Sequence, residues 1–329
     1  MRRREFVFLL GGGVVAWVFT ARAQQAGKVF RIGLLSGASA AIGPVDERNK
    51  SLTSGLARRG FVEGRNLIIE QRWANGHTDQ LGDLAAGLKA GKVDVIVAYG
   101  YPAALAAKIS ATETPTVISG AGDPVATGLV EGVARPGGFL TGVTELSTEL
   151  SAKRLEILRD AVPGLHTVAM LWNAADLGMS LRYRAAEDAA RVLGVKVQTL
   201  GVRQPDDFDQ AFAEMTRHRP DAILMVSDAL TNLNRKRVVD FAADKRLPTI
   251  FENASLVRDG GLMSYGPNQG AIGERVAELV VHILRGARPA DLPLELPTRF
   301  EFVINLKTAR TLGLNLPPAL IDRADEVIE

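Results

Sequence analysis

The side chains that could do chemistry in this chain are hydroxyls, carboxylates and amides that directly follow short apolar runs. In open parallel sheets, ligands lie beyond the carboxyl ends of the strands, which is where such residues meet. Two facing sets of them would form a cleft that binds a small polar ligand by hydrogen bonds. We predict as ligand contacts Ser36, Tyr99, Tyr101, Asp123, Asn173, Asp228, Glu252 and Tyr265.

Each of these candidates also has an ordinary structural interpretation. Ser36 and Asn173 could only cap the helices that follow them. Asp123 could hold its own turn, and Asp228 and Glu252 could be solvated loop carboxylates. The tyrosines could pack against the wall of the cleft or against a hinge.

No catalytic or metal-binding pattern accompanies these residues. The chain has no cysteine, and its four histidines are scattered without ligand spacing, so we expect no metal and no cofactor. The G-x-S-x-G elbow, the G-x-x-x-x-G-K-[ST] phosphate loop and a G-x-G-x-x-G after the first predicted strand are all missing. A Ser–His–Asp triad stays open, although no histidine ends a predicted strand. These absences favour binding over catalysis.

The candidate residues are positioned by alternating strand-like and helix-like segments. In a first array, the predicted strands are 29–36, 66–73, 94–98 and 116–119, and the helices 44–59, 79–90 and 102–112. In a second array, the strands are 167–172, 195–201, 221–226 and 248–251, and the helices 147–161, 176–193, 205–218 and 231–245. This alternation predicts an α/β fold with helices on both faces of parallel sheets. The remaining segment adds strands at 260–266 and 300–305. We expect two sheets, because one sheet of ten strands would be unusually large.

A glycine-rich segment, 121–148, separates the two arrays. It holds six glycines and two prolines, which interrupt regular structure. We expect it to end the first lobe and to contribute to the ligand site at Gly122–Pro124. We place its crossing to the second lobe at Thr141–Glu145.

The N-terminus has the pattern of an export signal. Arg2–Arg4 precede an apolar run over 7–19, which is followed by the cleavage pattern Ala21-Arg22-Ala23. The residues Arg3-Arg4-Glu5-Phe6 resemble the twin-arginine type, which exports folded proteins. A transmembrane anchor is the alternative, but the run of about 13 residues is shorter than the ~20 that span a bilayer. We therefore predict a cleaved signal over 1–23 and a periplasmic protein.

The basic character of the chain belongs to that signal. Residues 1–23 hold four of the 39 basic and one of the 37 acidic residues, so that 35 basic and 36 acidic residues remain. The remainder shows no Lys/Arg-rich patch with interleaved aromatic residues. This argues against nucleic-acid binding.

Several stretches, in this order and spacing, resemble the exported substrate-binding proteins of ABC transporters, in the group that includes tryptophan- and tyrosine-type binders. They are R-I-G-L-L at 31–35, G-F-V-E-G-R-N at 60–66, V-D-V-I-V at 93–97, P-A-A-L-A-A-K at 102–108, G-D-P-V at 122–125, R-P-G-G-F-L-T-G-V at 135–143, G-G-L-M-S-Y-G-P at 260–267 and the segment 307–329. The resemblance covers nearly the whole chain after residue 23.

The resemblance implies the type I periplasmic-binding fold, in which two doubly wound parallel-sheet lobes are joined by three hinge crossovers. Lobe I would hold 28–143 and 264–287, and lobe II would hold 145–262 and 294–329, with further crossings near 262–265 and 288–294. Carried over by position, ligand contacts fall on Ser36, the Tyr101 loop, Asp123, Asn173, Asp228 and Glu252.

Two positions depart from the family pattern. The chain has Tyr99-Gly100-Tyr101-Pro102 where relatives commonly have Gly-Gly-Thr-Pro, and Phe139 where they usually have Asn. An aromatic ring in place of a small hydroxyl should reshape the pocket. The resemblance therefore does not identify the ligand.

The resemblance implies a monomeric receptor without enzymatic activity. Such a protein captures a small polar solute, such as an amino acid, by hinge closure and delivers it to a permease and its ATPase at the inner membrane. One alternative is a ligand sensor that feeds a membrane signalling protein. Another is an exported enzyme on a two-lobed scaffold, which would turn its ligand over. A cytoplasmic repressor is disfavoured, because the export signal takes the place of DNA-binding helices.

Overall fold

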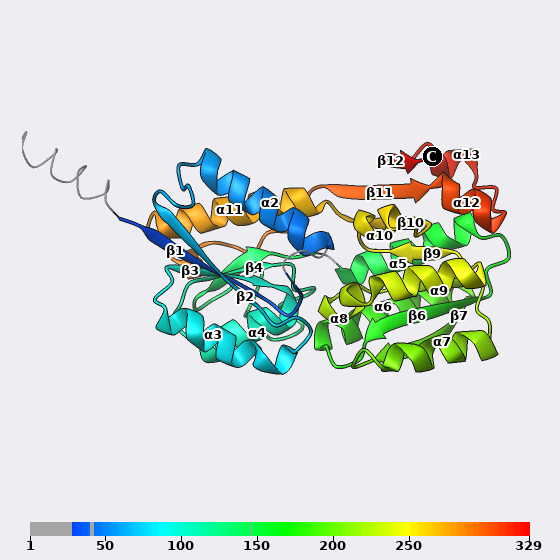
Figure 1. The fold of residues 1–329 in the computed structure, drawn as a ribbon, viewed down its shortest axis with the longest axis horizontal. Coiled ribbons are helices and arrows are strands. Elements are labelled where there is room, and N and C mark those ends of the chain that lie inside the picture. The colour runs from blue at the N-terminus through cyan, green and yellow to red at the C-terminus, as the bar shows by residue number, and fades with distance from the viewer. Residues whose placement is uncertain (1–27, 40–42, 146) are drawn as a thin grey trace, which may run out of the picture.

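Two separate β-sheets divide the chain into two lobes (Figure 1). The computed structural model describes residues 28–39, 43–145 and 147–329, so the predicted export signal lies outside the described residues. Lobe I is built on five strands in the spatial order β2 (Leu67–Trp73), β1 (Phe30–Ser36), β3 (Val95–Tyr99), β4 (Thr116–Ser119) and β5 (Leu140–Val143). Every pair in this sheet is parallel, as the sequence predicts.

Helices cover both faces of the sheet of lobe I, because its strands are apolar on both sides. All five residues of β3 are buried, which is typical of a central parallel strand. On one face, helix α2 (Gly43–Arg58) packs against α11 (Gln269–Leu284), and both helices contribute to one apolar core. On the other face, α3 (Leu81–Ala90) and α4 (Gly100–Ser110) form a second core.

Lobe II is built on seven strands in the spatial order β12 (Glu326–Ile328), β11 (Phe300–Asn305), β10 (Met263–Pro267), β9 (Thr249–Phe251), β8 (Ala222–Met225), β6 (Thr167–Asn173) and β7 (Lys196–Val202). Only the pair β10–β11 is antiparallel among the described strands. The helices that follow the strands are α5 (Ser147–Ala161), α6 (Leu177–Leu193), α7 (Asp207–Arg217), α8 (Ala229–Leu233), α9 (Arg235–Lys245), α10 (Ala254–Arg258), α12 (Leu306–Leu312) and α13 (Pro318–Ile321). Short 3-10 turns occur at Thr78–Gln80 and Pro289–Asp291.

The strand β10 corrects the sequence prediction, which assigns 264–287 to lobe I. Met263 and Ser264 pair with Ile250 and Phe251 of β9, so the strand belongs to lobe II. Only the helix α11 that follows it returns to lobe I, where it packs on α2. The second crossing therefore lies after Pro267 rather than at 262–265.

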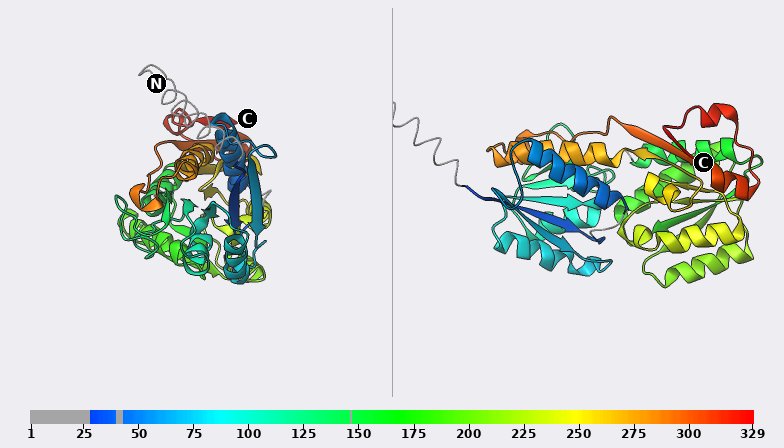
Figure 2. Two further views of the ribbon diagram at one scale, coloured as in Figure 1. Left: turned by 90° about the vertical axis from the view of Figure 1, so that its left-hand side faces the viewer. Right: turned by 45° about the horizontal axis from the view of Figure 1, so that its top comes forward.

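The first crossing falls within its predicted range of Thr141–Glu145, whereas the third lies just beyond its predicted range of 288–294. Residues 140–143 form an ordinary fifth strand of lobe I, so the first crossing comes after Val143. On the return path, Glu295 bridges to Val143, and Thr144 N–H donates to the Glu295 carbonyl at 2.8 Å. The third crossing therefore follows Glu295 and reaches β11 in lobe II. Figure 2 shows the two lobes end to end with these segments between them.

Close approach of backbones at the crossings requires glycine. A methyl group built on Gly142 of β5 would lie 2.2 Å from the carbonyl oxygen of Ile118, and the φ angle there is 151°. A methyl group on Gly266 of β10 would lie 2.1 Å from the Glu252 carbonyl oxygen. Both glycines let the backbone of their strand lie directly against a neighbouring backbone. No helix in the described part of the chain has the length and hydropathy of a membrane span.

Candidate functional site

A pocket of about 90 Å³ lies between the two lobes, at the carboxyl ends of their strands. This is the position at which open α/β sheets bind ligands, because loops from several strands converge there. The residues that line it include Ser36, Arg48, Thr78, Tyr99 and Tyr101 from lobe I, Glu145 and Gln269 beside the crossings, and Arg154, Asp176, Met179, Arg182, Ser227, Asp228, Asn232 and Glu252 from lobe II.

The two lobes touch around this pocket. A methyl group built on Gly178 of α6 would lie 3.6 Å from Cβ of Tyr101 in lobe I. One built on Gly37 of lobe I would lie 3.3 Å from Cβ of Ala229 in lobe II. At both glycines the space between the lobes is about that of one methyl group, and Arg182 of lobe II reaches Glu145 beside the first crossing, so the structure is a closed arrangement of the lobes.

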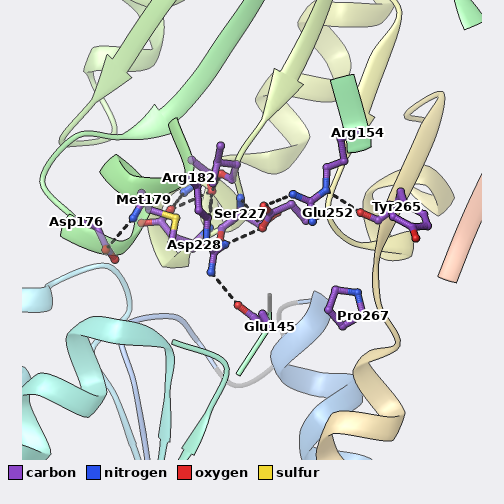
Figure 3. A network of polar contacts seen from close by, with 12 residues as sticks. Glu145, Arg154, Asp176, Met179, Arg182, Ser227, Asp228, Glu252, Tyr265 and Pro267 are labelled. Atoms are coloured by element: carbon purple, nitrogen blue, oxygen red, sulfur yellow. Dashed lines mark hydrogen bonds and ion pairs between the residues drawn. The ribbon is translucent and has the colours of Figure 1, made fainter. Parts of the chain in front are cut away.

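A chain of buried ion pairs forms one side of the pocket (Figure 3). Glu145 accepts from Arg48 and, at 2.8 Å, from Arg182. Glu252 accepts from Arg182 and Arg154, each at 2.8 Å. We refer to these five residues as the ion-pair chain. It runs from α2 in lobe I through the first crossing to α6, the end of β9 and α5 in lobe II.

Both ends of the ion-pair chain are tied to the crossings. Arg154 Nε donates to the Tyr265 carbonyl oxygen of β10 at 2.7 Å. Arg48 Nε donates to Gln269 Oε1 at 2.5 Å, and Gln269 Nε2 donates to the Pro267 carbonyl oxygen at 2.8 Å. The chain of charges thereby connects both lobes with two of the three crossings.

Glu145 stays ionised in this setting. Burial alone would raise the pKa of its carboxyl, but the charges of Arg48 and Arg182 outweigh burial and lower it to about 2. The side chain is 14% exposed. A carboxylate shared by two arginines from different lobes is therefore charged over the whole physiological pH range.

Asp176 is in the opposite electrostatic situation. It precedes α6 as its N-cap, and its Oδ1 accepts from the N–H groups of Gly178 at 2.7 Å and Met179 at 3.2 Å. Burial, and then the charge of Asp228, raise the pKa of Asp176 to about 6. Burial likewise raises the pKa of Asp228, which caps α8 through the Thr231 N–H at 2.8 Å.

Several buried polar atoms at the pocket have no hydrogen-bond partner. They belong to residues from lobe II, and they are Asp176 Oδ2, Arg182 Nε, Ser227 Oγ and Asn232 Oδ1. Buried polar atoms are normally satisfied, because an unmade hydrogen bond costs about 1–3 kcal/mol. Figure 3 shows the Asp176 carboxylate directed toward lobe I. These atoms are suited to contact a polar ligand held between the lobes.

Five of the eight predicted site residues line the pocket: Ser36, Tyr99, Tyr101, Asp228 and Glu252. Their direct contact with a ligand stays a prediction. Ser36 Oγ accepts from the Ala38 N–H at 3.1 Å, and the Tyr99 hydroxyl donates to Asn49.

The other three predicted residues lie outside the pocket lining. Asn173 lies behind it, where its amide donates to Asp228. Asp123 is exposed, and its Oδ1 accepts from the N–H groups of Val125 and Ala126, so it holds its own turn. The Tyr265 ring packs 6.3 Å from Phe302, and only its backbone carbonyl reaches the ion-pair chain.

Sequence reasoning missed the arginines and Glu145. Arg154 lies among Leu150, Leu155 and Leu158, and Arg182 lies between Met179 and Ala186 at helical spacing. Both arginines are at most 2% exposed. A charge on the apolar face of a helix was the signal that could have found them. Glu145 had no such signal, because it lies in the glycine-rich segment.

Among the described residues, no group of three or more His, Asp or Glu side chains is placed to hold a metal ion. Phe139, the other departure noted in the sequence, packs against the core beneath α3 and α4 and does not line the pocket.

Known proteins are similar to this chain over nearly all of its described length. A family model described as ABC transporter substrate binding protein matches residues 43–328. The chain is 24% identical to a tyrosine-binding protein of Clostridioides difficile over 82% of its own length and 77% of that protein. It is similar to a Streptococcus pneumoniae ABC domain in complex with L-Trp, with a TM-score of 0.84, 24% identity and coverage of 92% and 100%. A ligand-free, open substrate-binding protein from Clostridium difficile gives a TM-score of 0.66 at 24% identity, with coverage of 92% and 99%.

Proposed function

Because the chain belongs to the family of ABC transporter substrate-binding proteins, we propose that its interlobe pocket captures an amino acid and presents it to a membrane permease with its ATPase. Proteins of this family bind a substrate outside the cytoplasm and do not convert it. Two of the similar proteins are named for tyrosine binding and for a complex with L-Trp. These two amino acids are therefore the first ligands to test.

The observation that supports this proposal most strongly is the set of unpartnered atoms at a closed interlobe pocket. Asp176 Oδ2, Ser227 Oγ and Asn232 Oδ1 are buried and unsatisfied. A ligand that supplies hydrogen-bond partners to these atoms of lobe II and also contacts Tyr99 and Tyr101 of lobe I stabilises the closed arrangement more than an open one. Differential affinity of this kind is what drives closure.

We propose the following roles for the site. Asp176, Asp228 and Asn232 receive the ammonium group of the amino acid, and Tyr99, Tyr101 and Met179 surround its apolar body. Ser36 and Glu252 complete the polar lining predicted from the sequence, with Glu252 holding Arg154 and Arg182 in place. Asp123, Asn173 and Tyr265 support the site from outside its lining.

The cellular setting is part of the same proposal. We propose a periplasmic monomer, exported by the signal at 1–23, that meets its permease at the inner membrane and has no nucleic-acid partner. The charge balance after residue 23 supports the last point. A sensor role would differ in the membrane partner and not in the pocket.

Isothermal titration with the twenty amino acids tests the proposed function. We expect at least one aromatic amino acid to bind with a Kd of about 1 µM or below, which corresponds to about −8 kcal/mol. The recovered ligand should be chemically unchanged. The proposal would be contradicted if none of the twenty amino acids gave a binding signal, or if the ligand were converted during the experiment.

A further inference from the structure

The arginines at the pocket are already neutralised by the protein itself. Arg48, Arg154 and Arg182 are the cationic side chains in its lining, as far as the described residues go. Each of them is paired with Glu145, Glu252 or both. A guanidinium whose charge is balanced by a buried carboxylate offers little attraction to a second anion.

Acidic side chains outnumber the arginines in the same lining. Besides Glu145 and Glu252, it includes Asp176 and Asp228, and no arginine forms an ion pair with either of these two within the described residues. Asp228 accepts from Asn173 and Thr231, which are neutral groups. The unbalanced charge at the pocket is therefore negative.

The unpartnered atoms of the pocket are mainly acceptors. Asp176 is 4% and Asn232 is 8% exposed, and one oxygen of each side chain lacks a donor. Ser227 Oγ can donate or accept. The unpartnered donor is Arg182 Nε, which lies beside Gly122, where a built methyl group would be 3.7 Å away. Two acceptors, one of them a carboxylate oxygen, match an ammonium group, which has three donors and no acceptor.

From these observations we infer that the pocket recognises its ligand through an ammonium group and has no free cation to bind a ligand carboxylate. Organic amines with an apolar or aromatic body and no carboxylate therefore belong to its ligand class. This inference rests on the capture function proposed above. A carboxylate buried in this pocket would have no unbalanced cation and would face Asp176 and Asp228. The carboxylate of a bound amino acid would therefore contribute little to the affinity, and its removal should change the affinity little.

Two matched ligand series test this inference by isothermal titration. One series is L-tyrosine, tyramine and 3-(4-hydroxyphenyl)propionate, and the other is L-tryptophan, tryptamine and indole-3-propionate. Within a series the ring is constant while the ammonium or carboxylate group is removed. We expect the better-binding series to show amine affinity within about threefold of the amino acid, and acid affinity at least about 100-fold weaker.

The outcomes separate this inference from the function on which it rests. If an amino acid binds and its amine binds more than tenfold more weakly, the inference is wrong and the capture function stands. Binding of a propionate as tightly as its amine would also overturn the inference. If none of the six compounds binds, the inference and the choice of aromatic amino acids both fail.

The variant Asp176→Asn tests the residue whose unpartnered carboxylate oxygen would accept from the ammonium group. Asparagine keeps an oxygen to cap α6 and replaces the unpartnered carboxylate oxygen with an amide donor. We expect tyramine or tryptamine binding to weaken about 100-fold. Asp221→Asn is the matched control, because Asp221 also accepts from two backbone N–H groups, at 2.9 and 2.7 Å, but is exposed and does not line the pocket. It should leave the affinity unchanged, and equal losses in the two variants would overturn the inference.

Discussion

The two oxygens of Asp176 have different environments, and this makes the residue unfavourable for stability. Oδ1 caps α6, whereas Oδ2 is buried without a partner. Because burial and Asp228 raise the pKa of Asp176 to about 6, ionisation of this carboxyl is less favourable in the folded protein than in the unfolded chain. The raised pKa stabilises the fold below the unfolded value of about 3.9, and this stabilisation is lost as pH rises through about 6. Near neutral pH the unliganded protein holds an ionised carboxylate at a cost of about 3 kcal/mol.

We therefore predict that Asp176→Asn raises the stability of the unliganded protein at pH 7.5 and leaves it nearly unchanged at pH 4. The difference should approach about 3 kcal/mol, or several degrees in Tm. Thermal unfolding of both proteins at the two pH values measures it, and the comparison cancels the other titrating groups. If the Tm values of the two proteins differed by the same amount at both pH values, ionisation of Asp176 would not destabilise the folded protein.

At the scale of elements, the ion-pair chain joins parts of the molecule that are distant in sequence. Arg48 lies on α2, Glu145 follows β5, and Arg182 lies on α6. Without the carboxylate of Glu145, the guanidinium groups of Arg48 and Arg182 would face each other as like charges from opposite lobes. The lobes would then repel at the back of the pocket.

Glu145→Gln should accordingly lower the affinity for the captured amino acid about tenfold, because the closed arrangement becomes less favourable. Glu70→Gln is a matched control. Glu70 has the same side-chain exposure of 14% and also contacts two arginines, Arg31 and Arg72, but all three lie in lobe I. Both variants should lose thermal stability, and only Glu145→Gln should lose affinity in titration. A similar change of affinity in both variants would contradict the coupling of the lobes through Glu145.

The sequence predicts elements well where a local pattern decides them. Helix α5 spans 147–161 as expected, and the βα alternation gives the parallel sheets. The placement of β10 was wrong, because five residues can pair with either sheet, and the choice depends on β9 and β11, which are separate in sequence. Residues that follow strands, such as Ser36 and Asp228, could be placed at the pocket because a local pattern marks where each strand ends. The partners of Arg154 and Arg182 could not be predicted in this way. Those partners are set by the packing of whole lobes.

At the scale of the molecule, the two lobes are in a closed arrangement, and the proposed function depends on their opening. Gly178 lies opposite Tyr101, and Gly37 lies opposite Ala229, so the lobes approach each other closely at both glycines. To move the population from 1% to 99% closed, a ligand must favour the closed form by about 5.5 kcal/mol. The unpartnered atoms of Asp176, Ser227 and Asn232 offer interactions of that order once a ligand satisfies them.

Small-angle scattering, with and without the amino acid that binds most tightly in titration, measures this closure directly. The variant Gly178→Leu is the internal comparison, because its side chain would occupy the space beside Tyr101 that closure requires. We predict that ligand reduces the radius of gyration of the natural protein to the value of the closed structure, and that the variant stays expanded. An unchanged radius of the natural protein at saturating ligand would contradict capture by closure of the lobes.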